Sequence, residues 1–268
     1  SVFSNAEEKM APGTYQLDTD MDYRAIVTNL GSNSASRQMV TVTIPEGYTV
    51  DQISQRLEEN GVSTVEKLQD MAATHDYAFS FLQEIPLGDY KRLEGYLFPD
   101  TYEFYMGEDP KMVINKMLVN FDRRFTDEMR AQVQENGYTV RDIVIIASMI
   151  ERETDGTDRA TIASVIYNRW LNTSAGTAGY LGVDATLVYA LGRTITSEDY
   201  TADTPYNTYT HQGLPPGPIS NPGMESILAA MEPEDTNYYY YALGSDGTHS
   251  FFQTLEEQQN FIAQQRGE

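Results

Sequence analysis

Four acidic residues fall within eight positions of the sequence, at Glu151, Glu153, Asp155 and Asp158. Clustered carboxyl groups serve either general acid–base catalysis or the binding of hard cations such as Ca²⁺. Their order lacks the Asp-x-Asp-x-Asp-Gly arrangement of a calcium loop. We therefore predict no metal site and no cofactor here, and we take Glu151 as the candidate general acid.

The segment before Glu151 is predicted to be a helix that runs through the interior of its domain. Thr139 followed three residues later by Asp142 is a helix-start pattern, and residues 143–150 are almost all apolar. A helix that is apolar on every side is buried. Glu151 would then lie on its last turn, where burial and the negative end of the helix both favour a protonated carboxyl group. Such a group is suited to general acid catalysis near neutral pH.

An ordinary structural role is the alternative for Glu151. An acid at a helix end often turns to solvent or pairs with a neighbouring cation, and the nearby cations are Arg152, Arg159 and Arg169. Glu153 is offset by two residues and therefore belongs to another face of the helix. We assign Glu153 a structural role, which includes pairing with Arg169.

The composition excludes several classes of function. The 268 residues include 18 basic and 40 acidic residues, which gives a net charge of -22 and a pI near 4.3. Such a chain is not expected to bind nucleic acid or an anionic membrane surface. The absence of cysteine excludes disulfides, thiolate metal sites and a cysteine nucleophile. No apolar stretch approaches the roughly 18 residues needed to span a bilayer, and because the chain begins without Met we expect a preceding N-terminal segment.

A long loop is predicted over residues 204–223, which contain five prolines and three glycines. Structured loops of this length in compact domains are usually functional. We expect the loop to direct polar and aromatic side chains toward Glu151, namely Tyr206, Asn207, Tyr209 and His211. A loop that only packs against the domain is the alternative. Asp184 is expected to cap the helix that follows Leu181.

The N-terminal part reads as a small βα module. Residues 1–11 are predicted to be disordered or the remnant of a linker, and a strand followed by a capped helix is predicted twice, over 13–30 and 39–60, with a Ser/Gly/Asn linker at 31–36. The run from Ile44 to Ile53, Ile-Pro-Glu-Gly-Tyr-Thr-Val-Asp-Gln-Ile, resembles the LysM domain. That resemblance implies binding of N-acetylglucosamine-containing glycans. A structural module that binds no sugar is the alternative.

Seven motifs in order resemble the endolytic murein transglycosylase family, also called YceG-like. They are Glu94-Gly-Tyr-Leu-Phe-Pro-Asp-Thr-Tyr102, Ala147-Ser-Met-Ile-Glu-Arg-Glu-Thr154, Ala163-Ser-Val-Ile-Tyr-Asn-Arg169, Asp184-Ala-Thr-Leu-Val-Tyr189, Tyr206-Asn-Thr-Tyr209, Gly213-Leu-Pro-Pro-Gly-Pro-Ile-Ser-Asn-Pro-Gly223 and His249-Ser-Phe251. Two positions depart from the family pattern. Gly182-Val183 precedes Asp184, at a place where the family often has a polar residue. In the last helix, this chain has Glu257-Gln258 followed by Gln259-Asn260 where the family often carries Glu-His-Asn.

The resemblance implies an α+β fold: a LysM-like βα module over 12–88, followed by a mixed α/β catalytic domain over 89–268 that is built around the buried helix ending at Glu151. It implies a lytic transglycosylase that cuts nascent peptidoglycan strands between N-acetylmuramic acid and N-acetylglucosamine. Glu151 matches the family's catalytic Glu, and we assign substrate contacts to Tyr206, Asn207, Tyr209, Asp184 and His249.

The resemblance also implies a location and partners. The family acts at the outer face of the bacterial cytoplasmic membrane, held there by an N-terminal anchor. Peptidoglycan synthases or division proteins are the expected protein partners. Two other functions stay open. One is a peptidoglycan-binding or division scaffold without activity, and the other is a hydrolytic muramidase in which Glu153 or Asp184 activates water. A serine hydrolase is disfavoured, because no Gly-x-Ser-x-Gly elbow occurs and His75, His211 and His249 lie in dissimilar settings.

Overall fold

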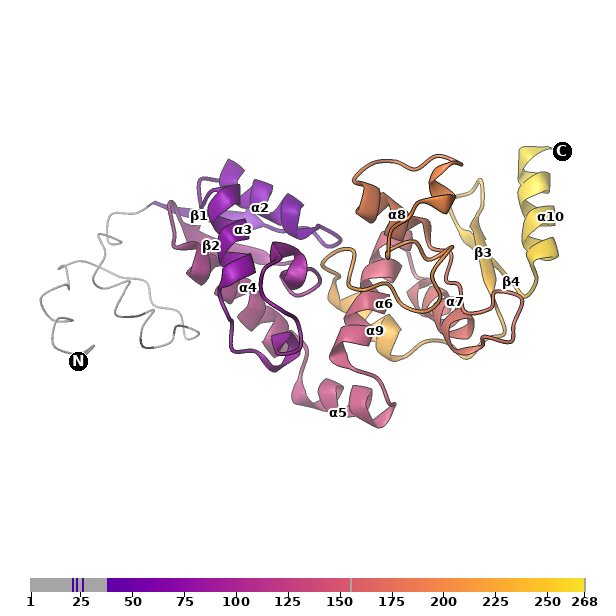
Figure 1. Ribbon diagram of the computed structural model, residues 1–268, viewed down its shortest axis with the longest axis horizontal. Helices are drawn as coiled ribbons and strands as arrows, with labels where there is room; N and C mark the ends of the chain where they lie inside the picture. Colours follow the sequence, from indigo (N-terminus) through magenta and orange to yellow (C-terminus); the bar gives the residue numbers. More distant parts are fainter. Residues whose placement is uncertain (1–20, 22, 24–25, 27–37, 155, 268) are drawn as a thin grey trace, which may run out of the picture. The chain divides into compact units, whose positions relative to one another are not determined.

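The computed structural model describes residues 21, 23, 26, 38–154 and 156–267. The predictions for 1–11, for the strand and helix over 13–30 and for the linker at 31–36 lie outside these residues, apart from three single positions. The chain divides into two compact units, and the boundary in the sequence lies between Arg124 and Phe125 (Figure 1). The mixture of helices with two small sheets confirms the α+β class.

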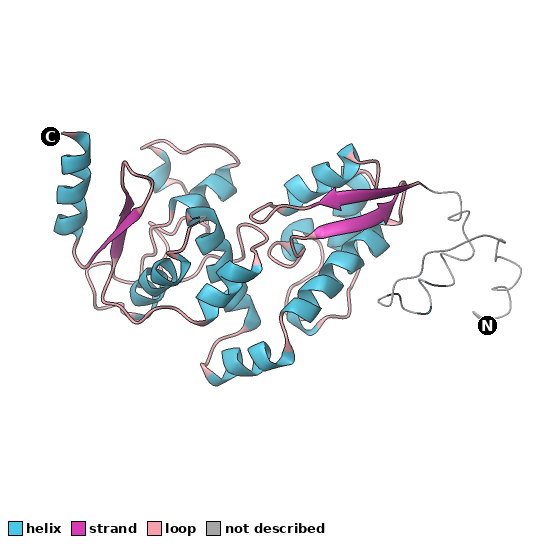
Figure 2. Ribbon diagram, turned by 180° about the vertical axis from the view of Figure 1, so that it is seen from behind, coloured by secondary structure: helices cyan, strands magenta, loops and turns pink. Residues whose placement is uncertain are grey.

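The first unit contains a two-stranded antiparallel sheet with helices beside it (Figure 2). Strand β1 (Met39–Thr43) pairs with β2 (Thr101–Tyr105), and Val42 lies opposite Tyr102. Its helices are α2 (Val50–Glu59), α3 (Val65–Thr74) and α4 (Pro110–Arg124), with short 3₁₀ turns at Ser80–Leu82 and Tyr90–Leu93. Helix α3 ends at Thr74, and the chain then turns so that Tyr77 and Phe81 enter the core.

The boundary expected between 88 and 89 falls inside this first unit. It would separate β1 from β2, which hydrogen-bond to one another along their whole length. The buried face of β2 carries Tyr102 and Phe104, and both belong to the core of this unit. A strand that comes late in the sequence therefore completes the module. The LysM-like character of the module stays a prediction.

The second unit is built around α6 (Val140–Glu153), which begins at Thr139 with the capping box that the sequence predicts. Every residue from Ile143 to Ile150 is at most 3% exposed, which confirms the buried helix. Helices α7 (Arg159–Leu171) and α9 (Met224–Met231) pack against α6 (Figure 1). The other elements are α5 (Asp127–Glu135), α8 (Asp184–Leu191), a 3₁₀ turn at Asp199–Thr201, the antiparallel pair β3 (Tyr240–Leu243) and β4 (His249–Phe252), and α10 (Leu255–Arg266).

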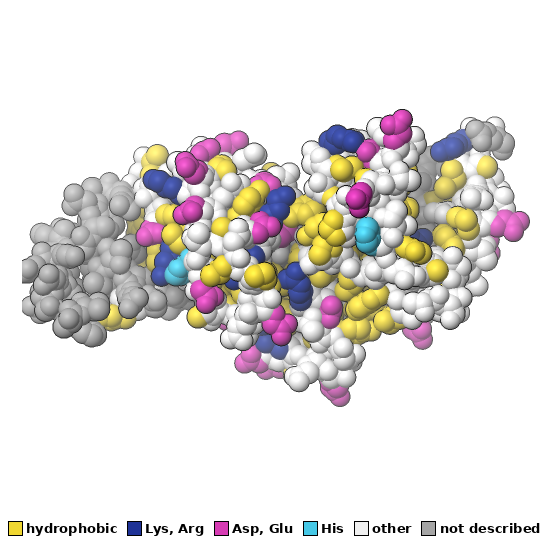
Figure 3. Space-filling model, in the orientation of Figure 1, with side chains coloured by type: hydrophobic (Ala, Val, Ile, Leu, Met, Phe, Trp, Pro, Cys, Tyr) yellow, Lys and Arg dark blue, Asp and Glu magenta, His cyan; other side chains and the backbone are white. Residues whose placement is uncertain are grey.

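The surface agrees with the charge balance of the sequence. On the face drawn in Figure 3, basic side chains are scattered among acidic ones and form no continuous basic patch. None of the helices in the described part of the chain is both long and apolar enough to cross a bilayer.

Candidate active site

Glu151 lies half-buried on the last turn of α6, and one of its two carboxyl oxygens is held by two donors. The backbone N–H of Gly223 donates to Oε2 over 3.0 Å, and the hydroxyl of Ser226 donates to the same oxygen over 2.7 Å. Gly223 is the N-cap of α9. The carboxyl group of Glu151 thus meets the positive N-terminal end of α9 as well as the negative end of its own helix. The sequence predicted only the second of these influences.

The proline-rich loop is fastened to α6 one turn before Glu151. Ser148 is fully buried, and its hydroxyl accepts a hydrogen bond from the backbone N–H of Ile219 over 3.0 Å. The hydroxyl of Ser220 donates to the backbone carbonyl of Ser148 over 3.2 Å. These bonds fix the loop beside the helix and therefore place Gly223 and Ser226 next to Glu151.

Arg159 reaches Glu151 only through Ser226. From the first turn of α7, its Nε donates to the Ser226 hydroxyl over 3.3 Å. Its Nη1 donates to the carbonyl of Gly156 over 2.6 Å and to Glu225 over 3.0 Å. For Arg159, one of the cations considered from the sequence, the described residues thus show a hydroxyl bridge to Glu151 in place of an ion pair.

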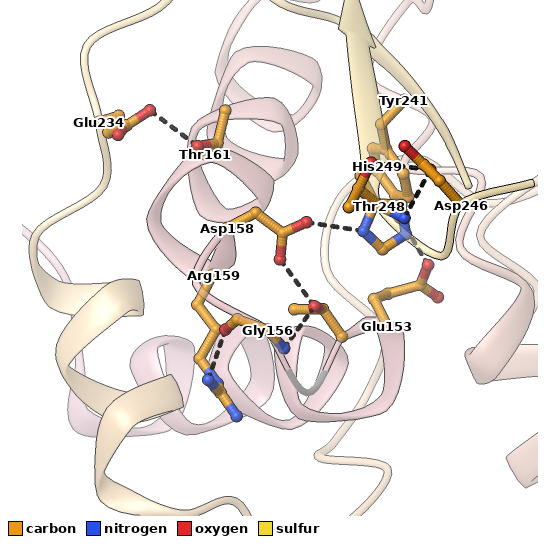
Figure 4. Close-up of polar contacts among 11 residues, drawn as sticks. Glu153, Gly156, Asp158, Arg159, Thr161, Glu234, Tyr241, Asp246, Thr248 and His249 are labelled. Carbon is orange, nitrogen blue, oxygen red and sulfur yellow. Dashed lines mark hydrogen bonds and ion pairs between the residues drawn. The ribbon is translucent and has the colours of Figure 1, made fainter. Parts of the chain in front are cut away.

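Glu153 lies beside Tyr241 (Figure 4) and is bonded to other residues than Glu151 is. Its carboxylate accepts a hydrogen bond from the Tyr241 hydroxyl over 2.8 Å. Burial raises the pKa of Glu153, the negative charge of Asp184 adds to the rise, and the hydrogen bond from Tyr241 offsets part of it.

The predicted pairing of Glu153 with Arg169 is not formed among the described residues. The Arg169 guanidinium donates instead to the backbone carbonyls of Tyr239 and Leu181, and it lies over the ring of Tyr240 at 5.1 Å. Carbonyl groups and a ring face can satisfy the planar guanidinium more completely than one carboxylate. Arg169 therefore ties β3 to the segment before α8.

Asp184 is the first residue of α8, and Val183 is its N-cap, which corrects the predicted capping role. The Asp184 carboxylate accepts hydrogen bonds from the hydroxyls of Tyr209 at 2.5 Å and Tyr200 at 3.4 Å. Burial raises the pKa of Tyr209, and the bond to Asp184 raises it further. Asp184 and Tyr209, both predicted to contact substrate, are therefore partners of one another.

His249 lies on β4 and holds the segment that follows α6 (Figure 4). Its Nδ1 lies 2.7 Å from a carboxylate oxygen of Asp158, and the Thr154 hydroxyl donates to the other oxygen over 2.7 Å. Burial alone would raise the pKa of Asp158, but the bonds from Thr154 and His249 outweigh it and lower that pKa. The side chain of His249 is only 9% exposed. His249 is thus a partner of Asp158, and its contact with substrate stays a prediction.

The aromatic half of the long loop does not reach Glu151. Asn207 is fully buried and shapes the loop: its side-chain amide donates to the carbonyls of Tyr200 and Ala202, and its oxygen accepts from the Tyr209 N–H. Asn207 thus has a structural role in the loop, and its contact with substrate stays a prediction. Tyr206 packs against Tyr189 with ring centroids 5.2 Å apart, and His211 is exposed.

Gly223, Ser226 and Tyr241 are the site residues that the sequence did not predict. The clue to Gly223 was its place at the end of the proline-rich motif, directly before a helix. No local pattern marks Ser226 or Tyr241. Within the described residues, no group of three or more His, Asp or Glu side chains is arranged to hold a metal ion, and Asp155 lies outside them.

Comparison with known proteins identifies the family. The model of the YceG-like family matches residues 1–264. The chain is 32% identical to an endolytic murein transglycosylase of Bacillus subtilis (strain 168), over 91% of this chain and 70% of that protein. It is 30% identical to one of Streptococcus pneumoniae serotype 2 (strain D39), over 94% of this chain and 50% of that protein.

A solved structure agrees with these matches. The crystal structure of a yceG-like protein from Listeria monocytogenes is 32% identical in sequence to this chain and superposes with a TM-score of 0.70. The match covers 97% of this chain and 87% of the Listeria chain. A match over nearly the whole sequence, together with the same fold, shows that the chain belongs to the YceG-like family.

Proposed function

We propose that this protein cleaves the β-1,4 bond between N-acetylmuramic acid and N-acetylglucosamine inside peptidoglycan strands and leaves 1,6-anhydro ends. Its family and its relatives' names support a lytic transglycosylase that acts on peptidoglycan. The chain spans 70% of the Bacillus relative and half of the pneumococcal one. The bond that is cut and the product are our proposal.

The observation that carries the proposal is the setting of Glu151. Its carboxyl group is fixed by two donors on one oxygen at the end of a rigid buried helix. A general acid needs such fixed geometry beside the oxygen that it protonates. Glu151 gives its proton to the glycosidic oxygen while the bond from that oxygen to muramic acid C1 breaks through an oxocarbenium-like state.

The same carboxylate completes the reaction. It removes the proton from the C6 hydroxyl of the muramic acid, whose oxygen then bonds to C1 and closes the anhydro ring. Glu151 ends the cycle protonated again, and no water is consumed. One carboxyl group therefore suffices, in contrast to the carboxylate pair of most glycoside hydrolases.

The surroundings of the other acids favour this one-acid reaction. Glu153 is bonded to Tyr241, Asp184 to Tyr209 and Asp158 to His249. A hydrolytic muramidase would need one of them to activate a water molecule, and each is already occupied by a side chain. This argues against the hydrolytic alternative.

The place of action follows from the substrate. Peptidoglycan lies outside the cytoplasmic membrane, so the protein acts on the extracytoplasmic side. An N-terminal membrane anchor and contacts with peptidoglycan synthases or division proteins remain part of the proposal, as does glycan binding by the LysM-like module.

The test is mass spectrometry of the muropeptides that the protein releases from uncrosslinked glycan strands. The native protein should make anhydro-muramic ends and Glu151→Gln should make none. Glu153→Gln is the matched control, since it makes the same substitution two residues further along the same helix, and it should retain the product. Hydrated reducing ends would show a muramidase, and glycan binding without any product from the native protein would show a scaffold.

A further inference from the structure

The chemistry of the groups around Glu151 determines which of them donates in each hydrogen bond. A guanidinium N–H can only donate, so the Ser226 hydroxyl oxygen is the acceptor of the bond from Arg159 Nε. The one hydroxyl hydrogen of Ser226 is then free to point at its other partner, Oε2 of Glu151, 2.7 Å away. The backbone N–H of Gly223 is likewise only a donor. Oε2 therefore faces two donors.

A proton on Oε2 is disfavoured in this arrangement, because the Gly223 N–H and the Ser226 hydroxyl both direct a hydrogen at that oxygen. The other oxygen, Oε1, takes no hydrogen bond from the residues that the structure describes. Any proton bound to Glu151 therefore belongs on Oε1.

We propose that Arg159 and Ser226 are positioning residues that keep Oε2 free of protons and confine the catalytic proton of Glu151 to Oε1. This inference rests on the proposed function for its meaning in catalysis, although proton placement can be tested without it. It specifies that both the glycosidic oxygen and the C6 hydroxyl must approach Oε1.

The hydroxyl bridge explains why Arg159 does not bind Glu151 directly. A guanidinium in contact with the carboxylate would favour its ionised form and so hinder proton donation. With Ser226 between them, Arg159 orients the hydroxyl while its own charge is neutralised by Glu225, at 3.0 Å. Arg159 also lines an open pocket of about 540 Å³ together with Glu225 and Leu228, so its outer edge faces solvent.

The kinetic test compares two bridge variants with matched controls. Ser226→Ala and Arg159→Gln should each lower kcat roughly tenfold, the effect of one lost hydrogen bond in the transition state, with little change in KM.

The controls separate positioning from general damage. Ser164→Ala removes another buried serine hydroxyl, which bonds Thr236 and not Glu151, and it should stay within about twofold of native activity by the same reasoning. Glu225→Gln keeps the bond from Arg159 to Ser226 and should retain more activity than Arg159→Gln. An unchanged kcat in Ser226→Ala, or an equal loss in Ser164→Ala, would overturn the proposal.

Neutron diffraction of the native protein in deuterated buffer at about pH 3, below the usual range for a glutamic acid, tests the proton position without reference to activity. We expect a deuteron on Oε1 and the Ser226 deuteron directed at Oε2. A deuteron on Oε2 would refute the inference even if the enzyme makes anhydro products. A protein that shows the deuteron on Oε1 but makes no product would refute the proposed function and leave the proton placement standing.

Discussion

Glu151 and Glu153 stand two residues apart on the last turn of α6, yet their carboxyl groups are bonded to different elements. Glu151 accepts from the N-cap of α9, and Glu153 accepts from the Tyr241 hydroxyl on β3. Residues two apart on a helix point in nearly opposite directions. The end of α6 therefore carries two carboxyl groups in different surroundings, one in the candidate active site and one beside Tyr241.

Glu153→Gln should stabilise the protein more at high pH than at low pH. Folding raises the pKa of Glu153 above its unfolded value, which is near 4.3. The contribution of Glu153 to stability is therefore fully present below the unfolded pKa and is lost as the pH rises through the higher folded pKa. Gln carries no charge at any pH and can still accept from Tyr241. The difference in unfolding free energy between variant and native protein, measured with urea at pH 4 and pH 8, should grow with pH. A constant difference would contradict this.

Asp158→Asn should have the opposite pH dependence. Folding lowers the pKa of Asp158, so its carboxylate stabilises the protein at pH values above the unfolded pKa, which is near 3.9. This contribution is lost as the pH falls through the folded pKa. Losing a charge-assisted hydrogen bond to His249 should cost about 1.5–3 kcal/mol at pH 7. Urea unfolding at pH 7 and pH 3 measures it, and an undiminished cost at pH 3 would count against the prediction.

Ser148→Ala should release the proline-rich loop from α6. The buried N–H of Ile219 would lose its acceptor, at a cost of about 1–3 kcal/mol. Because the same loop carries Gly223, activity should fall as well as stability. Denaturant unfolding and product formation should both be compared with Ser164→Ala, which should affect stability alone. Full activity in Ser148→Ala would mean that Gly223 is placed without this bond.

Gly182→Ala should destabilise the second unit by about 1–2 kcal/mol or more. Gly182 has φ +59°, a conformation that costs other residues this much, and an added Cβ would lie 3.2 Å from Arg169 Nη1 and 3.3 Å from Tyr209 Cε1. The departure from the family's polar pattern just before Asp184 thus coincides with a crowded turn. Thermal unfolding checks this prediction, which would fail if the melting temperature did not change.

The elements that depend on local sequence patterns could be predicted. Helix α6 was predicted because its capping box and its apolar run lie within fifteen residues, and the same interval identifies Glu151. The terminal acids of this helix could also be assigned to different faces from helical geometry alone.

The partners of these acids could not be predicted, because they come from distant parts of the chain. Ser226 lies 75 residues from Glu151, and Tyr241 lies 88 residues from Glu153. The loop was expected to present its aromatic half to Glu151, but its tight turns at Asn207 commit that half to Asp184 and Tyr189. Which half of a loop faces a site depends on tertiary packing, of which the sequence gives no local sign.

The pairing of β1 with β2 bears on how the molecule can be divided for study. A fragment that starts at residue 89 would keep β2 without its partner, with unpaired backbone groups beside Tyr102 and Phe104. Such an edge recruits strands from other molecules and leads to aggregation. A fragment that starts near Phe125 would contain no orphaned strand, and it is therefore the better choice for crystals of the second unit alone.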